Sequence, residues 1–399
     1  MRFPILCDKI TCTGCAACAN ICPVSCIEMK QDAEGFLFPN VDLERCTQCL
    51  LCEEHCPVLH PNPDTNYITP KVYAAWHKDL NIRLKSSSGG AFSALAEYVI
   101  NSGGVVFGAS YDEDLNVNHS YAESIDALDP LRSSKYSQSY IGQSYNEIRT
   151  FLKLGKLVLF VGTPCQVSGL ISYLGKPHEN LILCDLVCHG VPSGLLFHKY
   201  KIWLADKIGS FPTNFNFRDK TKGWMDSLRV GKFNGKTIQM NGAMDAYFLF
   251  YNLNLTLRES CYNCPSIGFP RKGDITIGDF WGIGKSPLNR GSNIHHGISL
   301  ILANNAKGVK YLSLLDKNLI RMEKTVDDSI HHNKPLIIPP ERPIGRNTFY
   351  RDLESVPFES LIVKYRNLSL KTKCISWIRE NMPRNLLIFL RSIFNKFFL

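Results

Sequence analysis

The middle of the chain alternates between short apolar segments and segments whose apolar positions recur every three or four residues. Residues 71–76 and 105–109 are runs rich in valine, alanine and aromatic residues, which predict strands. Residues 91–100 place Phe92, Leu95 and Val99 on one face of a helix. This part of the chain therefore predicts a strand, a helix and a second strand, in that order.

Two later runs, residues 156–161 and 181–187, are apolar throughout, and a helix ending near Leu174 is predicted between them. Strands without a polar face are covered on both sides, and such strands separated by helices form parallel sheets. The region therefore predicts an α/β domain with a largely parallel sheet. Ligands of such sheets gather beyond the carboxyl ends of the strands. Cys184 lies inside its strand and is expected in the core.

The cysteines change this picture at the N-terminus, where two runs have the spacing C-x2-C-x2-C-x3-C-P. Bacterial ferredoxins with two 4Fe-4S clusters have this spacing, and the fourth cysteine of each run binds the other cluster. The expected ligand sets are Cys12, Cys15, Cys18 and Cys56 for one cluster, and Cys46, Cys49, Cys52 and Cys22 for the second. Residues 1–60 are thus predicted to form an α+β, ferredoxin-like two-cluster module.

Other uses of these thiols are buried packing or a pair of zinc sites, but zinc sites commonly use separate C-x2-C halves. Cys7 and Cys26 lie within the module and outside both runs. We interpret both as packed thiols and not as ligands.

Composition narrows the class of protein. The chain has 399 residues, enough for about two or three domains. Its net charge of +9 is spread along the chain without a recognisable nucleic-acid-binding motif, so no nucleic acid partner is expected. An acidic redox partner, an anionic cofactor and a solvated basic surface all fit this charge. The absence of a signal-peptide pattern and of a long apolar run predicts a cytoplasmic protein. There, its 16 cysteines favour metal over disulfides.

Four further cysteines come from three separate segments. Cys165 and Cys188 each follow a predicted strand, and Cys261 and Cys264 form a C-x2-C pair before Pro265. Four thiols are the ligand set of one more 4Fe-4S cluster. The alternatives are a redox dithiol at the C-x2-C pair, inert packing, and a reactive thiolate at Cys165, whose pKa a helix N-terminus would lower.

Polar residues beside the predicted strands are further candidates. A Ser-Gly loop at residues 86–90 opens a helix, which suits an anion, although serine is also an ordinary helix cap. Lys135 lies in a polar loop that also suits phosphate. His189 is a candidate ligand or proton donor, or a structural residue of a turn. Asp279 is a candidate acid near a flavin, or a solvated carboxylate at a strand end.

Five motifs together resemble the family of coenzyme F420 hydrogenase and dehydrogenase beta subunits. They are SSGGAFS at 87–93, GTPCQ at 162–166, CHGVPS at 188–193, CYNC at 261–264 and DITIGDFWG at 274–282. The resemblance implies a flavin domain that binds FAD, holds a 4Fe-4S cluster and exchanges hydride with coenzyme F420 or another small organic substrate. By motif position it implies FAD contacts at Ser87, Ser88, Gly89, Gly90, Lys135 and Thr163.

These expectations give the domain boundaries. The module occupies residues 1–60, a linker 61–70, the two parts of the flavin domain 71–155 and 156–341, and a basic tail 342–399. On a helix, residues 383–399 separate Arg384, Arg391 and Asn395 from a wide apolar sector, as in interfacial helices. Docking onto the chain's own body or another protein chain, including a second copy, and contact with a membrane surface both stay open.

Clusters move single electrons, whereas hydride acceptors take two, so a flavin is needed between them. The leading hypothesis is an FAD- and iron-sulfur-dependent oxidoreductase, with an external electron donor or acceptor protein and a small-molecule hydride acceptor as partners. A non-catalytic electron-relay subunit of a larger redox complex is the alternative. A cluster-bearing sensor or scaffold without flavin is the third.

Overall fold

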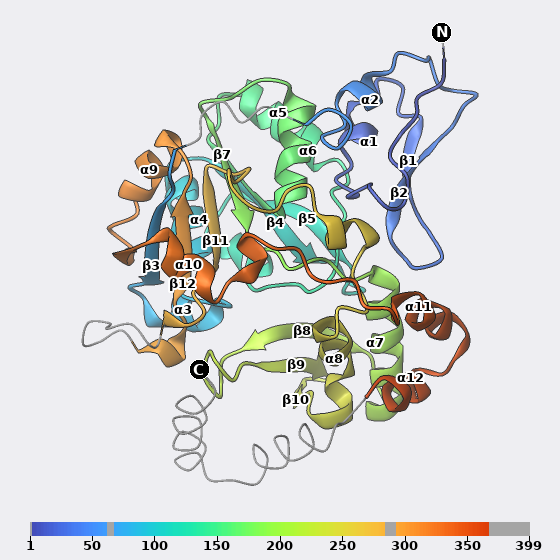
Figure 1. Cartoon of the computed structure of the whole chain (residues 1–399). Helices are drawn as coiled ribbons and strands as arrows, with labels where there is room; N and C mark the ends of the chain where they lie inside the picture. Colours follow the sequence, from blue (N-terminus) through green and yellow to red (C-terminus); the bar gives the residue numbers. More distant parts are fainter. Residues whose placement is uncertain (1, 62–67, 284–292, 367–399) are drawn as a thin grey trace. The chain divides into compact units, whose positions relative to one another are not determined.

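The computed structural model describes residues 2–61, 68–283 and 293–366 (Figure 1). The chain divides into two compact units, Met1–Arg351 and Asp352–Leu399. The first unit contains both the cysteine-rich module and the α/β region. In the second, α12 spans Phe358–Tyr365. The amphipathic helix predicted for residues 383–399 lies outside the described residues.

The module repeats its local structure along with its cysteine spacing. Its elements are α1 (Ala17–Ile21), β1 (Ile27–Gln31), β2 (Leu37–Val41) and α2 (Leu51–Glu54). Both helices start inside a cysteine run, after a residue with left-handed backbone: Ala16 with φ 61° and Leu50 with φ 62°. Strands β1 and β2 pair antiparallel, with Ile27 opposite Val41. Each run therefore turns sharply in the same place, which brings its first cysteines around one point.

The α/β region is built on an eight-stranded sheet with the order β13-β3-β12-β11-β7-β6-β4-β5. The strands are β3 (Lys71–His77), β4 (Val105–Tyr111), β5 (Val117–Ala122), β6 (Val158–Gly162), β7 (Leu181–Leu186), β11 (Ile275–Asp279), β12 (Ser299–Ala303) and β13 (Leu319–Lys324). Neighbours β4, β6, β7 and β11 are parallel. Strand β3 runs the same way, because it is antiparallel to β12, which is antiparallel to β11. The carboxyl ends of these five strands share one edge.

The prediction of a largely parallel sheet is thus confirmed for the central strands and incomplete at the sides. Strands β5, β12 and β13 run opposite to the others, so the sheet is mixed. Helices α4 (Ala91–Asn101) and α9 (Ala306–Ser313) cover one face, and α5 (Ser144–Lys153) and α6 (Pro164–Leu174) the other. In β6, Leu159 packs towards α4 and Phe160 towards α6, which explains why that strand is apolar throughout.

A second, smaller sheet was not predicted. Strands β8 (Pro212–Asp219), β9 (Leu228–Phe233) and β10 (Lys236–Gln239) form an antiparallel sheet beside α7 (Gly194–Ile208) and α8 (Ala246–Asn252), below the large sheet in Figure 1. The remaining helices are α3 (Leu80–Lys85), α10 (Val326–His331) and α11 (Arg346–Ser355). No helix among the described residues is both long and apolar enough to cross a bilayer.

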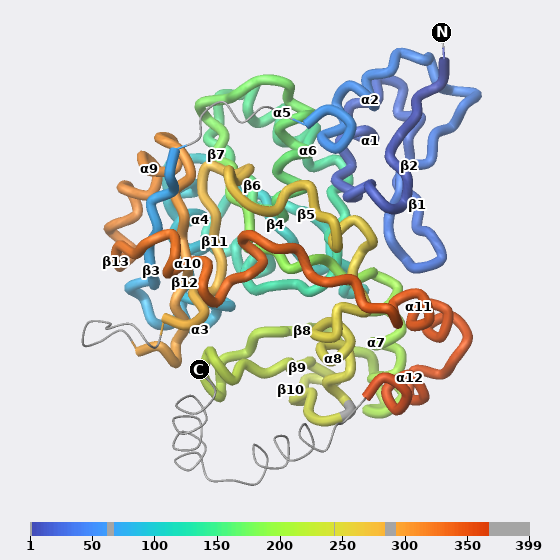
Figure 2. The backbone as a smooth tube through the Cα atoms, in the orientation of Figure 1, coloured from blue at the N-terminus to red at the C-terminus, as the bar shows by residue number. Residues whose placement is uncertain are grey.

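The module packs against the α6 face of the large sheet, as the traces in Figures 1 and 2 show. Cys15, Ala16 and Ala17 belong to the same apolar core as α5 and α6. The His55 ring contacts the Ser172 carbonyl at the C-terminal part of α6. The site predicted for the first cluster is therefore part of the common core of this unit.

Candidate electron-transfer site

The eight cysteines of the two runs line two separate cavities. Cys12, Cys15, Cys18 and Cys56 line one. Cys22, Cys46, Cys49 and Cys52 line the other. The last cysteine of each run has crossed to the cavity of the other run, which is the grouping that a two-cluster ferredoxin requires. All described cysteines are free thiols, as ligands must be.

Each cavity also contains a fifth thiol. Cys7 Sγ lies 3.6 Å from Cys56 Sγ, and Cys26 Sγ lies 3.4 Å from Cys22 Sγ. Both extra thiols therefore contact the cysteine that crosses over. Sequence reasoning placed Cys7 and Cys26 in the module but missed these contacts, since neither spacing belongs to a ligand motif.

The four cysteines of the second region meet beyond the carboxyl ends of β6 and β7. Cys165 is the second residue of α6, and Cys188 follows β7. Cys261 lies in the 3-10 turn Glu259–Asn263, and Cys264 follows that turn directly. Burial raises the pKa of Cys188 well above its ordinary range, and the neighbouring charges of Cys261, Cys165 and Cys264 raise it further. All four sulfurs thus lie within electrostatic range of one another.

The pKa of Cys165 opposes the interpretation of this residue as a reactive thiolate. Its position at a helix N-terminus favours a low pKa, and the Thr163 hydroxyl contacts its sulfur at 3.1 Å. Burial outweighs both effects and raises the pKa of Cys165 to about 11. Burial likewise raises the pKa of Cys261 to about 12. A metal would deprotonate such thiols on binding, so the set suits ligands better than nucleophiles.

A buried guanidinium between the two regions supports an anionic cluster at this third site. Arg258 is 1% exposed and, among the described residues, has no carboxylate partner for an ion pair. Its charge lowers the pKa of both Cys165 and Cys261, against the larger effect of burial. A buried cation without a counterion is costly. A 4Fe-4S cluster on four thiolates carries net negative charge and would balance Arg258.

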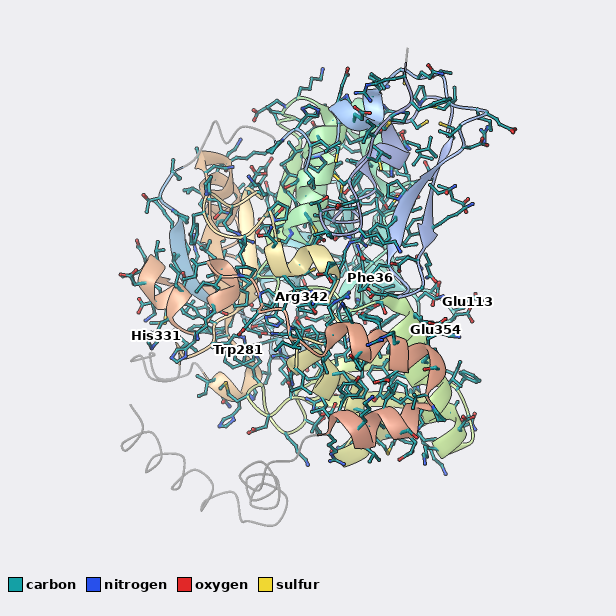
Figure 3. All side chains as sticks on the ribbon, turned by 45° about the vertical axis from the view of Figure 1, so that its right-hand side comes forward. Phe36, Glu113, Trp281, His331, Arg342 and Glu354 are labelled. Atoms are coloured by element: carbon teal, nitrogen blue, oxygen red, sulfur yellow. The ribbon has the colours of Figure 1, made fainter. Side chains whose placement is uncertain are left out.

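The same arginine joins the module to the third set of thiols. Its Nε donates to the Cys12 carbonyl at 2.7 Å and its Nη2 to the Leu37 carbonyl at 3.0 Å. Its Nη1 donates to Gln138 Oε1 at 3.0 Å. The guanidinium also lies over the rings of Phe36 and Phe38 of the module's hairpin. Phe36 is labelled in Figure 3, where side chains fill the space between hairpin and sheet.

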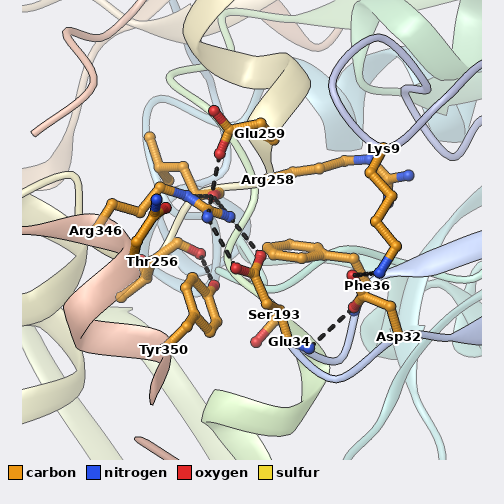
Figure 4. Close-up of polar contacts among 12 residues, drawn as sticks. Lys9, Asp32, Glu34, Phe36, Ser193, Thr256, Arg258, Glu259, Arg346 and Tyr350 are labelled. Atoms are coloured by element: carbon orange, nitrogen blue, oxygen red, sulfur yellow. Dashed lines mark hydrogen bonds and ion pairs between the residues drawn. The ribbon is translucent and has the colours of Figure 1, made fainter. Parts of the chain in front are cut away.

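A second arginine, Arg346, also joins the module's hairpin to the segment that carries Cys261 (Figure 4). Arg346 donates to both carboxylate oxygens of Glu34 in the module, at 3.0 and 2.7 Å. It also pairs with Glu259 at 3.1 Å, two residues before Cys261. The Arg346 side chain is 2% exposed. A bidentate buried pair of this kind fixes geometry well, so the hairpin and the turn that carries Cys261 are held together.

The first cluster cavity and the third set of thiols meet at α6. A methyl group at Gly169 would lie 2.9 Å from Cys15 Cβ and 3.1 Å from its Sγ. Only glycine allows this approach between the module and α6, whose second residue is Cys165. The charge of Cys165 also raises the pKa of Cys15, after burial, which is the main cause. The two predicted cluster sites are therefore neighbours.

The Ser-Gly loop lies at the same sheet edge, after β3. Ser87 Oγ accepts from the Ser134 amide at 2.8 Å, which joins this loop to the one that carries Lys135. The Gly89 and Ala91 amides donate to Ser299 Oγ, at 2.9 and 3.4 Å. Two of the loop's N–H groups are thus used within the protein. Lys220 supports the loop by donating to the Ser88 carbonyl at 2.7 Å.

A cavity of about 540 Å³ opens beside this loop. Its cationic lining residues are Lys85, Arg132 and Lys220. Lys135 donates to two carbonyls of its own loop, Pro130 and Arg132, and burial lowers its pKa to about 7. Asp129 and Asp219 line the same cavity, and Asp129 pairs with both Lys85 and Arg132. Lys220 donates to the Ser88 and His296 carbonyls, each at 2.7 Å. Sequence reasoning had not found Lys85, Arg132 or Lys220. Single basic residues in loops carry no motif.

Asp279 is not the solvated carboxylate that its strand-end position suggested. Its carboxylate accepts from Arg218 at 2.9 and 3.3 Å and from Trp224 Nε1 at 2.6 Å. The Arg218 side chain is 5% exposed, and its guanidinium lies over the ring of Trp281. Asp279 therefore holds β8 to the end of β11. His189 Nε2 donates to Asn254 Oδ1 at 2.7 Å, and the His189 ring packs against Tyr251.

The family defined by the C terminus of the coenzyme F420 hydrogenase/dehydrogenase beta subunit matches residues 155–328, and a 4Fe-4S dicluster domain matches residues 11–59. One subunit of the F(420)H(2) dehydrogenase of Methanosarcina mazei is 24% identical over 188 residues, which are 44% of this chain and 53% of that protein. An uncharacterised ferredoxin of Methanocaldococcus jannaschii is 32% identical over 81 residues, 20% of this chain and 95% of that protein.

The chain spans about half the length of the first two relatives it matches, 53% and 54%. A chain of the F420-reducing NiFe hydrogenase complex from Methanosarcina barkeri aligns over 78% of this chain and 94% of its own length. Its sequence identity is 16% and the TM-score is 0.45, which is too low to carry conclusions about this chain.

Proposed function

Since residues 155–328 match the family of coenzyme F420 hydrogenase/dehydrogenase beta subunits and residues 11–59 match a 4Fe-4S dicluster domain, we propose that the chain is an iron-sulfur flavoprotein oxidoreductase. Electrons would pass between an external protein and FAD through two clusters in the module and one in the α/β region. The substrate would be coenzyme F420 or another small organic molecule that exchanges hydride. When bound, FAD supplies the conversion between single electrons and hydride.

The contact between Cys15 and Gly169 is the observation that carries this proposal. It joins the wall of the first cluster cavity to α6, whose second residue is Cys165. A chain whose cluster sites were merely structural would have no need to bring them together. Cys12, Cys15, Cys18 and Cys56 would hold the cluster nearest to the α/β region. Cys165, Cys188, Cys261 and Cys264 would hold the third cluster, with Arg258 as its buried counter-charge.

The residues around these sites would fix their relative positions and exclude water from them. Arg258 and Arg346 hold the module's hairpin to the loop of Cys261, and the rings of Phe36 and Phe38 cover the guanidinium of Arg258. Exclusion of water and hydrogen bonds to sulfur set cluster potentials. We assign FAD phosphates to the loop of Ser87, Ser88, Gly89 and Gly90, with Lys135 and Thr163 as further contacts. His189 and Asp279 stay as candidate catalytic residues.

An electron relay is the second candidate function, because the relative from Methanosarcina mazei is named as one subunit of a dehydrogenase. In that case this chain would pass electrons to or from protein partners of a larger complex without a substrate of its own. The two candidates share the clusters and differ in whether the isolated chain turns over a small molecule.

The test uses the full chain, purified without oxygen and assayed for FAD, iron and turnover. Reduced methyl viologen would be the donor and coenzyme F420 the acceptor. We expect bound FAD and F420 reduction that Cys261→Ala abolishes, whereas Cys184→Ala, a buried thiol outside every predicted ligand set, retains it. Bound FAD with dye oxidation but no F420 reduction would favour the relay. A chain without flavin would overturn both the FAD assignment and the oxidoreductase.

A further inference from the structure

A large cavity in the described part of the chain has Cys165, a proposed ligand of the third cluster, at one end, and the proposed function gives the rest of its lining no role. It lies over β7, on the face of the sheet covered by α6, and we name it the β7 cleft. Residues of α6 (Cys165, Ile171, Leu174), β7 (Leu181, Leu183), the segment 270–274 and the start of α9 (Asn304 to Lys307, Lys310) line it, with Thr13, Pro57 and Val58 of the module. Its volume is about 910 Å³, within the upper range of small-molecule sites.

The cleft runs along the strands and has two different ends. Cys165, Thr13 and Pro57 lie at the end near the carboxyl edge of the sheet. The other end lies at the amino edge, because β12 is antiparallel to β11 and α9 begins where β12 stops. The Ser-Gly loop precedes α4, which covers the opposite face. The β7 cleft is therefore separate from the loop assigned to FAD.

Charge at the α9 end favours an anion. Lys176, Lys272, Lys307 and Lys310 line this part of the cleft. The N-terminus of α9, eight residues long, opens into it, and its first-turn dipole adds to the positive potential. Of the carboxylates in the lining, Asp274 accepts from the Leu183 amide and from Asn305, and lies 3.6 Å from Lys307 Nζ. Glu179 is the other one. Lys307 also donates to the His178 carbonyl at 2.9 Å, so the excess positive charge comes from Lys176, Lys272 and Lys310.

Two buried polar atoms in the lining lack a partner within the described part of the chain. Asn304 is 3% exposed, and its Oδ1 accepts no hydrogen bond, although its Nδ2 donates to the Gly273 carbonyl and to Thr276. Thr13 is 7% exposed, and its Oγ1 has no partner either. Both atoms are shielded from solvent, so they make the wall of the cleft polar without offering its ligand a direct contact.

Between the two ends the lining is apolar. Ile171, Leu174 and Leu183 are only half-buried although they belong to a central helix and a central strand. A bare inorganic anion would leave this surface uncovered. The volume and the apolar middle both require an organic ligand.

We propose that the β7 cleft binds an organic anion with an apolar body. The anionic group would lie near Lys307, Lys310 and the start of α9. The apolar body would lie against Ile171 and Leu183, and its inner end would reach the walls of the first and third predicted cluster sites at Thr13 and Cys165. The inference concerns binding alone and does not depend on the proposed flavin chemistry.

The test measures binding of 8-anilinonaphthalene-1-sulfonate, an aromatic anion, by isothermal titration calorimetry. The full chain is purified without oxygen and titrated with excess FAD present. N-phenyl-1-naphthylamine, which lacks the sulfonate, is the neutral counterpart. We expect one saturable site for the anion, and binding of the neutral compound weaker by about tenfold or more.

Two sets of variants locate the site. The double variant Lys176→Glu and Lys310→Glu should weaken binding of the anion about tenfold. Its matched control, Lys153→Glu and Lys317→Glu, changes exposed lysines outside the cleft by the same charge and should leave the affinity unchanged. Ile171→Trp, which fills the middle of the cleft, should reduce the affinity for both compounds. Equal weakening by the control variant, or unchanged affinity in Ile171→Trp, would overturn the proposal, as would the absence of saturable binding.

Discussion

Replacing Arg258 with alanine is expected to loosen the module from the third set of thiols. The guanidinium donates three hydrogen bonds, to the Cys12 and Leu37 carbonyls and to Gln138 Oε1. All three acceptors lose their donor, in a buried environment at Cys12 and a partly buried one at Leu37 and Gln138. The variant also removes a buried positive charge that acts on both Cys165 and Cys261.

The size of the effect follows from these three bonds. An acceptor left without its donor in the interior costs about 1–3 kcal/mol. Water that enters the space left by the side chain will satisfy part of the loss, so we expect a total of about 3–5 kcal/mol for the three acceptors. A loss of this size is a large part of the stability of an ordinary domain, which is about 5–15 kcal/mol.

The assay is urea unfolding without oxygen, followed by the release of iron to a chelator. The matched control is Arg321→Ala, which removes two hydrogen bonds to Asp316 at the surface. An exposed pair contributes about 0–1 kcal/mol. We expect Arg258→Ala to unfold at clearly lower urea and to release iron faster than Arg321→Ala. If the two variants unfold alike and release iron at the same rate, Arg258 does not anchor the module.

Other predictions use single substitutions. Gly169→Ala should displace Cys15, lower the free energy of unfolding by about 1–3 kcal/mol through overpacking, and speed the loss of iron. Gly194→Ala in α7 should do neither, because its added methyl group would lie 4.0 Å from the nearest atom. Burial lowers the pKa of His119 from 6.5 to about 4. Between these values the unfolded chain binds a proton that the folded chain does not, so stability should fall by about 2 kcal/mol from pH 7 to pH 5. In urea unfolding at both pH values, the stability of His119→Gln should fall less than that of the wild type. An equal fall in both would refute the role of His119. Cys7→Ala should retain its iron, and a loss of four iron would make Cys7 a ligand.

Much of the central fold was predictable because its signals are local. Residues 156–161 and 181–187 form β6 and β7 because strands covered on both faces need apolar residues at every position. The crossed grouping of the first eight cysteines also follows from local spacing. The helix over 91–100 was confirmed as α4 for the same reason.

The remaining features depend on contacts between distant segments, which no local pattern announces. Arg218 and Asp279 lie 61 positions apart in the sequence, so Asp279 looked solvated. Arg258 is a single arginine before a C-x2-C pair and gave no sign of its burial. Strands β8 to β10 were missed because they mix polar and apolar residues without strict alternation, as the exposure of β8 shows. The cavity beside the Ser-Gly loop is likewise assembled from residues far apart in the chain.

The most direct test of the account is an iron count on the chain purified without oxygen, for the wild type and for Cys261→Ala. Three clusters predict about twelve iron atoms per chain, and about eight after the substitution, because each cluster contains four. Cys184→Ala should keep about twelve. About eight iron atoms in the wild type, unchanged in Cys261→Ala, would contradict the third cluster and the path from the module into the α/β region.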